Sequence, residues 1–193
     1  MVDLDGGLVL VGPDSEWFWT AFSGIVVAIS LVAVFRQLRL QVGQKMRDDA
    51  AAMEARYYSE RFLRYRLQVA LARRDGVGVE DMPDGACRAI VSFWDEVGAF
   101  VRAKHIDRKM TAQMMGTAAV TGWHQLQPWI ELQRSAFLGG APDQPSDYEW
   151  LVPELIRAEP GLASLLEEPP PEFYDGWVAN LEELIAVEVA LRT

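Results

Sequence analysis

Two histidines, His105 and His124, and one cysteine, Cys87, are the side chains of this sequence best suited to metal binding or nucleophilic chemistry. They fall on different predicted helices, and neither histidine has a second His or Cys at the spacing of zinc ligands. Diiron sites in helical bundles use Glu-x-x-His pairs, and the sequence contains none. We therefore expect no metal ion and no cofactor, with Cys87 a small buried apolar residue and His105 a helix-ending residue.

The acidic pairs Asp95-Glu96 and Glu182-Glu183 are the remaining candidates for acid–base chemistry. On amphipathic helices such pairs form a solvated face, and a glycosidase dyad needs a cleft that tunes two pKa values. The segment Gly76-Val77-Gly78 lacks the strand and the Lys-Ser/Thr of a phosphate-binding loop, and no Gly-x-Ser-x-Gly motif occurs. The sequence thus favours a protein without catalytic activity, and an enzyme would need a site that no linear motif reveals.

An apolar run from Trp17 to Phe35, without a charged residue, is the strongest pattern in the chain. A bilayer core needs about 20 apolar residues in a helix, so the run predicts a transmembrane helix. Trp17 and Trp19 at one end suit the headgroup region, and Arg36 and Arg39 at the other can reach the interface. A cleaved signal peptide would begin with basic residues, and a buried core helix rarely stays apolar all round for this length.

The charges that flank this run differ in sign. Acidic residues precede the run and mostly cationic residues follow it, namely Asp3, Asp5, Asp14 and Glu16 before it and Arg36, Arg39, Lys45 and Arg47 after it. The positive-inside rule then predicts a single-pass protein of the inner (plasma) membrane, with residues 1–16 outside and residues 36–193 in the cytoplasm.

Small residues recur on one face of the predicted anchor. Thr20, Gly24 and Ala28 are four positions apart, a spacing that lets two transmembrane helices approach closely. A homo-oligomer that packs through this face is one interpretation, and small residues that simply face lipid are the other.

The charge of the chain is strongly segregated. Residues 36–74 carry ten Lys and Arg against four Asp and Glu, whereas residues 110–193 carry three against thirteen. Anionic lipid headgroups attract the basic segment, and the acidic segment is repelled by lipid and by nucleic acid. We therefore expect the lipid bilayer, a second copy or a cytoplasmic protein as partners and no nucleic acid. Attraction between the basic and acidic segments is an alternative use of the charge.

Residues 36–74 contain no proline and consist largely of good helix formers, which predicts one long basic stalk helix. An apolar stripe runs along it at spacings of three or four through Leu38, Val42, Met46, Ala50, Met53 and Tyr57. A lone helix of this length needs a partner for its stripe, so we expect a coiled coil with a second copy or packing by the following helices.

The rest of the chain predicts a small antiparallel helical bundle, so that the expected fold is all-α. The bundle core is expected over 84–138, with a helix over 84–105, a third helix capped by Asp107, and a fourth that Pro128 kinks or starts. An acidic, proline-containing helical tail is expected over 139–193, and the sequence leaves open whether residues 140–193 pack on the bundle or hang from it.

The stretch from Ile90 to Phe137 carries a signature of the form Trp-x-x-Leu-x-Pro-x-Ile-x-x-x-Arg, formed by Trp123, Leu126, Pro128, Ile130 and Arg134. With Trp94 and the preceding apolar run, over about residues 15–140, it resembles a family of bacterial and phage proteins with a domain of unknown function behind one transmembrane helix. The resemblance implies no catalytic residue.

In physical terms the apolar members of the signature are expected to pack in the bundle, and Arg134 to pair with Asp95 or Glu96. The tryptophans beyond the anchor, Trp94 and Trp123 among them, are expected to be core residues, and exposed ones would mark a partner surface.

These patterns favour a membrane-anchored scaffold or protein-interaction module. The alternative is a membrane-acting effector in phage–host conflict that oligomerises through its anchor.

Overall fold

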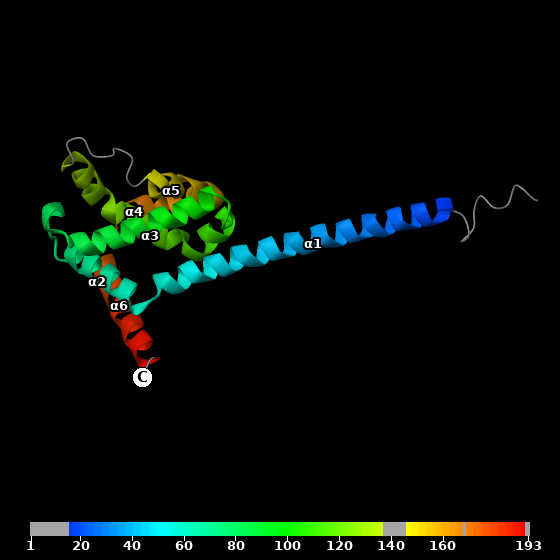
Figure 1. Ribbon diagram of the computed structural model, residues 1–193. Coiled ribbons are helices and arrows are strands. Elements are labelled where there is room, and N and C mark those ends of the chain that lie inside the picture. The colour runs from blue at the N-terminus through cyan, green and yellow to red at the C-terminus, as the bar shows by residue number, and fades with distance from the viewer. Residues whose placement is uncertain (1–15, 137–145, 168, 192–193) are drawn as a thin grey trace, which may run out of the picture. The chain divides into compact units, whose positions relative to one another are not determined.

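The computed structural model describes residues 16–136, 146–167 and 169–191, and all of its regular structure there is helical (Figure 1). The expected all-α fold class is thus confirmed. The expected order is confirmed as well, since a long N-terminal apolar helix is followed by a helical bundle. The helices in chain order are α1 (Glu16–Tyr57), α2 (Glu60–Arg74), the 3-10 helix η2 (Val79–Asp81), α3 (Asp84–Arg102), α4 (Arg108–Ala136), α5 (Ser146–Ala158), the 3-10 helix η3 (Pro160–Leu166) and α6 (Pro171–Ala190).

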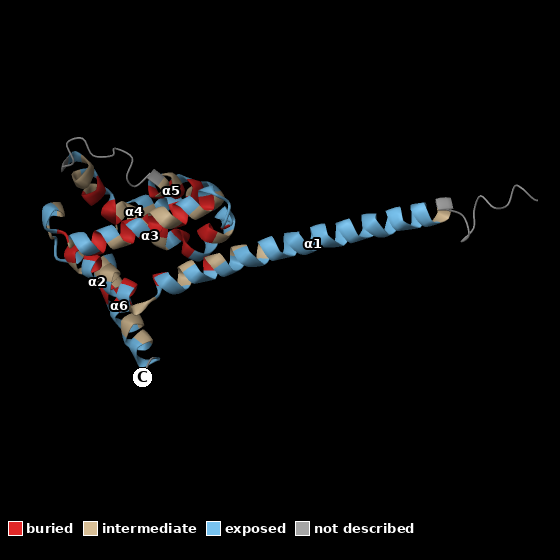
Figure 2. Cartoon of the chain, viewed as in Figure 1, coloured by how far each residue is buried: buried red, intermediate tan, exposed pale blue. Residues whose placement is uncertain are grey.

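The chain divides into two compact units, residues 1–45 and residues 46–193. In the described part of the first unit, α1 has almost only exposed side chains (Figure 2). The second unit begins with the last three turns of α1 and holds all the other helices. Its buried residues form one main core and one smaller cluster.

The single helix expected over 36–74 is interrupted at Tyr58 and Ser59. Helix α1 continues from the apolar run to Tyr57, and α2 begins at Glu60 after an extended Ser59 (φ −62°, ψ 144°). The Ser59 hydroxyl donates to the Arg56 carbonyl, and the Leu63 amide donates to the Ser59 carbonyl. The apolar stripe changes register after Tyr57, and the break lets both helices bury their own apolar side chains.

Helix α3 lies at the centre of the main core. Phe93, Trp94 and Val97 are almost completely buried, because its apolar residues recur at the spacing of one helix face. Helix α5 packs against both α3 and α4, and Tyr148, Leu151 and Leu155 on it are fully buried. Of the segment expected as a tail after residue 138, α5 thus belongs to the main core.

The two helical stretches expected after Asp107 form one helix, α4. The Asp107 carboxylate accepts a hydrogen bond from the Met110 amide at 2.8 Å, which is the expected N-cap. Pro128 lies inside α4 without starting a new helix. Gly116 does not interrupt α4 either: a Cβ there would come within 2.7 Å of the Leu162 side chain, so the position serves the packing of η3.

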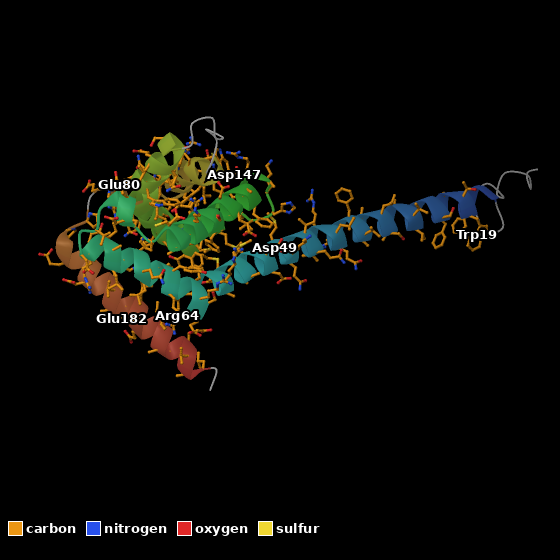
Figure 3. The ribbon with its side chains drawn as sticks, turned by 60° about the vertical axis from the view of Figure 1, so that its left-hand side comes forward. Trp19, Asp49, Arg64, Glu80, Asp147 and Glu182 are labelled. Carbon is orange, nitrogen blue, oxygen red and sulfur yellow. The ribbon has the colours of Figure 1, made fainter. Side chains whose placement is uncertain are left out.

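A smaller apolar cluster joins α2 to α6. Leu63 and Ala70 of α2 are buried with Val178 and Leu181 of α6, and Trp177 packs beside them. The two helices run side by side in opposite directions, and Figure 3 shows Arg64 on α2 and Glu182 on α6. The last helix of the expected acidic tail is thus packed on the basic α2, through apolar side chains.

The close approach of α3 and α5 generates a prediction about Gly98. A Cβ at this position would lie 2.6 Å from the carbonyl carbon of Asp147, which is main chain and cannot rotate away. We expect Gly98→Ala to lower the free energy of unfolding by about 1–3 kcal/mol, the usual cost of overpacking. The measurement is denaturant unfolding of the full chain in mild detergent, followed by tryptophan fluorescence.

Gly85 of the same helix is the matched control, because a Cβ there meets nothing within 4 Å. We expect Gly85→Ala to change stability by less than about 1 kcal/mol, in the stabilising direction. Equal destabilisation by both substitutions would contradict the packing explanation.

Candidate functional site: the exposed apolar helix and the aromatic cluster

The apolar half of α1 has no protein partner within the described chain. This helix is long and apolar enough to cross a membrane, and none of its most apolar 18-residue window is buried. Ile29, Leu31, Val32 and Phe35 are each more than 60% exposed. A core helix of a soluble protein would bury such residues, so the exposure leaves roughly 20 apolar positions to be covered by something other than this chain.

Aromatic and basic side chains lie at opposite ends of this segment. At its start Trp19 packs against Phe18 and Phe22, with ring centroids 5.7 and 6.0 Å apart, whereas the Trp17 side chain lies outside the described residues. At its end the Arg39 guanidinium lies 5.8 Å from the centre of the Phe35 ring, and Arg36 is exposed. This is the distribution of aromatic and cationic residues typical of membrane interfaces.

The polar side chains within the segment are satisfied locally. The Ser23 hydroxyl donates to the Thr20 carbonyl at 3.0 Å, and the Ser30 hydroxyl donates to the Val26 carbonyl at 2.8 Å. Such bonds remove the cost of placing a hydroxyl in hydrocarbon. Gly24 and Ala28 are exposed on the same helix, and nothing lies within 4 Å of a Cβ built at Gly24.

The end of α1 is held by a cluster of aromatic rings, which we call the aromatic cluster. It comprises Tyr57 of α1, Phe62 of α2, Phe93 and Trp94 of α3, Trp123 of α4 and Tyr148 of α5. The Tyr57 ring is buried, with its centre 5.4–5.6 Å from those of Phe62, Phe93 and Trp94. Aromatic pairs at such distances add about 0.5–1.5 kcal/mol each beyond area burial.

Two arginines extend this attachment with cation–π contacts. Arg66 of α2 lies over the Tyr57 ring at 4.0 Å, and burial lowers the pKa of its guanidinium. Arg56 lies 5.5 Å from the centre of the Phe93 ring and pairs with Glu96 at 2.5 Å. The last turn of α1 is therefore bound to α2 and α3 by apolar, cation–π and ionic contacts together.

On the other side of the cluster, α5 is fixed by hydrogen bonds. The Asp95 carboxylate accepts from the amides of Asp147 and Tyr148 and so caps the start of α5. The buried Tyr148 hydroxyl donates to the Ala119 carbonyl at 2.7 Å, and its ring stacks on Trp94. Burial raises the Tyr148 pKa well above its usual value, so the hydroxyl stays protonated and donates at every physiological pH.

The residues of the sequence signature occupy different environments. Trp94, Leu126 and Ile130 are buried in the main core, whereas Trp123 and Pro128 are half-buried. The ion pair that the structure gives Arg134 is with Glu149 of α5, at 2.7 Å. The partner expected at Asp95 or Glu96 is thus corrected, because Glu149 of α5 supplies the carboxylate.

Sequence reasoning missed Tyr57, Tyr148 and Gly98 as a joint feature of the core. The signals in the sequence for this contact were Gly98 in the apolar face of α3 and Tyr148 at the start of α5. Both residues look ordinary until α3 and α5 are known to touch.

Cys87 and the histidines are not among the rings of the aromatic cluster, although His124 directly follows Trp123. Cys87 is completely buried, and burial raises its pKa to about 12, with nearby Asp84 acting in the same direction and Arg73 opposing. The thiol is therefore neutral at pH 7. His105 is exposed and packs edge-on against Phe100, and its amide donates to the Phe100 carbonyl at the end of α3. Among the described residues no three His, Cys, Asp or Glu come together as a metal site.

Fold and site define a helical bundle built on one long helix whose first half is uncovered and apolar. Comparison with protein families matches residues 20–152 to the Domain of unknown function (DUF4760). The chain belongs to this family. The match begins within the apolar segment and ends inside α5, so it includes the aromatic cluster and leaves α6 outside. Comparisons with curated proteins and with solved structures give no match.

The aromatic cluster generates a prediction about Tyr57. We expect Tyr57→Ala to lower the free energy of unfolding by about 3–5 kcal/mol, as for other large-to-small changes at buried aromatic residues. Denaturant unfolding of the full chain in mild detergent measures the change.

The neighbouring Tyr58 is 43% exposed and provides the control. We expect Tyr58→Ala to cost about 1 kcal/mol or less, the worth of one aromatic contact with Tyr57. If Tyr57→Ala costs no more than Tyr58→Ala, the cluster does not hold the end of α1.

Proposed function

We propose that this protein is a single-pass membrane-anchored helical scaffold, with residues 17–35 in the inner (plasma) membrane. The observation that supports it is that none of the most apolar window of α1 is buried, whereas the other large apolar side chains of the described residues are mostly buried. In water this segment would leave an apolar surface far larger than soluble proteins normally expose. A bilayer covers it without further protein.

The flanking charges favour one orientation of the anchor. Arg36, Arg39 and Lys45 follow the apolar segment, and the charged side chains that precede it are all acidic. Under the positive-inside rule, residues 1–16 lie outside and residues 36–193 lie in the cytoplasm. On the cytoplasmic side, Arg36, Arg39 and Lys45 also face anionic lipid headgroups. This attraction contributes about 1 kcal/mol of membrane-binding free energy per cation.

The cytoplasmic bundle is the part that serves as the interaction module. Helix α6 carries the exposed carboxylates Glu172, Asp175, Glu182 and Glu183. A surface of this sign repels nucleic acid and lipid and suits a protein partner. The proposal assigns the protein no catalysis, no cofactor and no nucleic-acid partner.

Anchor and orientation are tested together by thiol labelling. We expect the protein to remain in the membrane fraction after alkaline carbonate extraction. A membrane-impermeant maleimide should label Ser15→Cys in intact cells and label Ser164→Cys only after lysis, since Ser164 lies on the bundle. Cys87 is buried, so the unsubstituted chain gives the background.

Labelling of Ser164→Cys in intact cells would contradict the orientation. Recovery of the protein in the soluble fraction would contradict the anchor itself.

The open surroundings of Gly24 favour a second candidate function, a membrane-acting effector of the phage-associated kind that the signature suggests. Such a protein would oligomerise in the bilayer and perturb it. Thr20, Gly24 and Ala28 are exposed on one face of α1, which permits close helix contact.

Expression tests separate the two functions. An effector should depolarise or arrest cells, and Gly24→Leu should abolish the effect because it fills the close-contact face. Ala33→Leu on the opposite face should leave it intact. A scaffold should be tolerated in all three forms, and membrane-potential dye fluorescence with growth curves gives the measurement.

A further inference from the structure

The apolar face of α1 continues beyond the proposed membrane segment. Leu38 and Val42 follow the first cations of the chain, yet they are 51% and 60% exposed. Together with Phe35 and Arg39 they line a shallow apolar groove along two turns of the helix. The groove begins at Phe35, the last residue of the proposed membrane segment, and Leu38 and Val42 lie beyond that segment.

The spacing along this face is that of a coiled coil. Gly24, Ala28, Leu31, Phe35, Leu38 and Val42 follow one another at intervals of four, three, four, three and four residues. This is the a/d pattern of a heptad repeat, and it continues from the membrane segment into the groove without a change of register. We call these six residues the seam.

The seam ends where the chain begins to cover α1 itself. The next heptad position is Lys45, which is exposed and is the last residue of the first unit. From there the apolar residues of α1 turn to their own bundle, since Ala50 and Tyr57 are buried in it. One helix thus has two stretches of apolar surface, of which only the second is covered within the chain.

We propose that a second copy of this chain covers the seam, in a parallel pair that runs from Gly24 to Val42. The inference rests on the proposed membrane anchor. Two copies anchored in one bilayer share direction and depth, so equal turns of α1 lie level and Leu38 meets Leu38 of the other copy. A heptad seam is complementary to itself in this arrangement.

The chemistry of the seam fits that occupant. Gly24 and Ala28 let the two backbones approach within the bilayer, where close packing rather than the hydrophobic effect drives association. Arg39 lies beside the seam over the Phe35 ring, so its charge flanks the groove instead of filling it. Lys45 would oppose its own copy, which ends the pair where each bundle begins.

Cysteine cross-linking in native membranes tests the pair. Leu38→Cys and Val42→Cys place thiols on the seam, and Leu40→Cys places one on the opposite face at a residue of the same type and similar exposure (68%). After mild oxidation we expect a disulfide dimer from the first two variants and only the background of the unsubstituted chain from Leu40→Cys. A matched pair of charge variants gives the second measurement: Leu38→Glu should halve the native mass in detergent from twice the 21.6 kDa of one chain, and Leu40→Glu should not change it.

Each other outcome has a definite meaning. Equal cross-linking at Leu38 and Leu40, or none at any position, overturns the pair while recovery in the membrane fraction leaves the anchored scaffold standing. A Leu38 disulfide to a different protein overturns the second copy as the occupant. Recovery in the soluble fraction overturns both the anchor and the pair.

Discussion

The burial of the Tyr57 ring is the interaction on which the rest of the structure depends. It lies at the end of a 42-residue helix, and it is the point where that helix becomes part of a folded core. Phe93 and Trp94 of α3 receive the ring, and Arg66 covers it from α2. The short break at Tyr58 and Ser59 follows from this arrangement, because a continuous helix could not bury both Tyr57 and the apolar side chains of α2.

The bundle is organised around a second constraint, the close contact of α3 with α5. It requires a glycine at position 98, and it places Asp95 where it caps α5. Tyr148 then completes the aromatic cluster and donates to the α4 backbone. Ion pairs of Arg102 with Asp147, and of Arg108 with Glu154, tie the surface of α5 to its neighbours. In both pairs the carboxylate is largely covered, whereas the arginine is exposed.

The proposed membrane anchor and the proposed seam overlap on α1 from Gly24 to Phe35, but they make different demands on the sequence. The proposed anchor needs only length and apolarity, which any lipid-facing helix supplies. The proposed seam needs a particular spacing, and Leu38 and Val42 supply it outside the hydrocarbon core. Because Ala50 and Tyr57 belong to the bundle, any pairing of α1 through the seam would bring two bundles to the same membrane surface.

The sequence by itself determined the all-α class, the apolar helix, the cap at Asp107 and the apolar faces of α3 and α6, because these depend on local periodicity and capping chemistry. It did not determine the break after Tyr57, the continuity of α4 through Pro128, or the partner of Arg134. It also left open whether residues 139–193 pack on the bundle, whereas α5 is central to the core. These features depend on contacts between segments far apart in the chain: whether Gly98 meets a backbone, and whether Glu149 reaches Arg134, is decided only when α5 packs on α3 and α4.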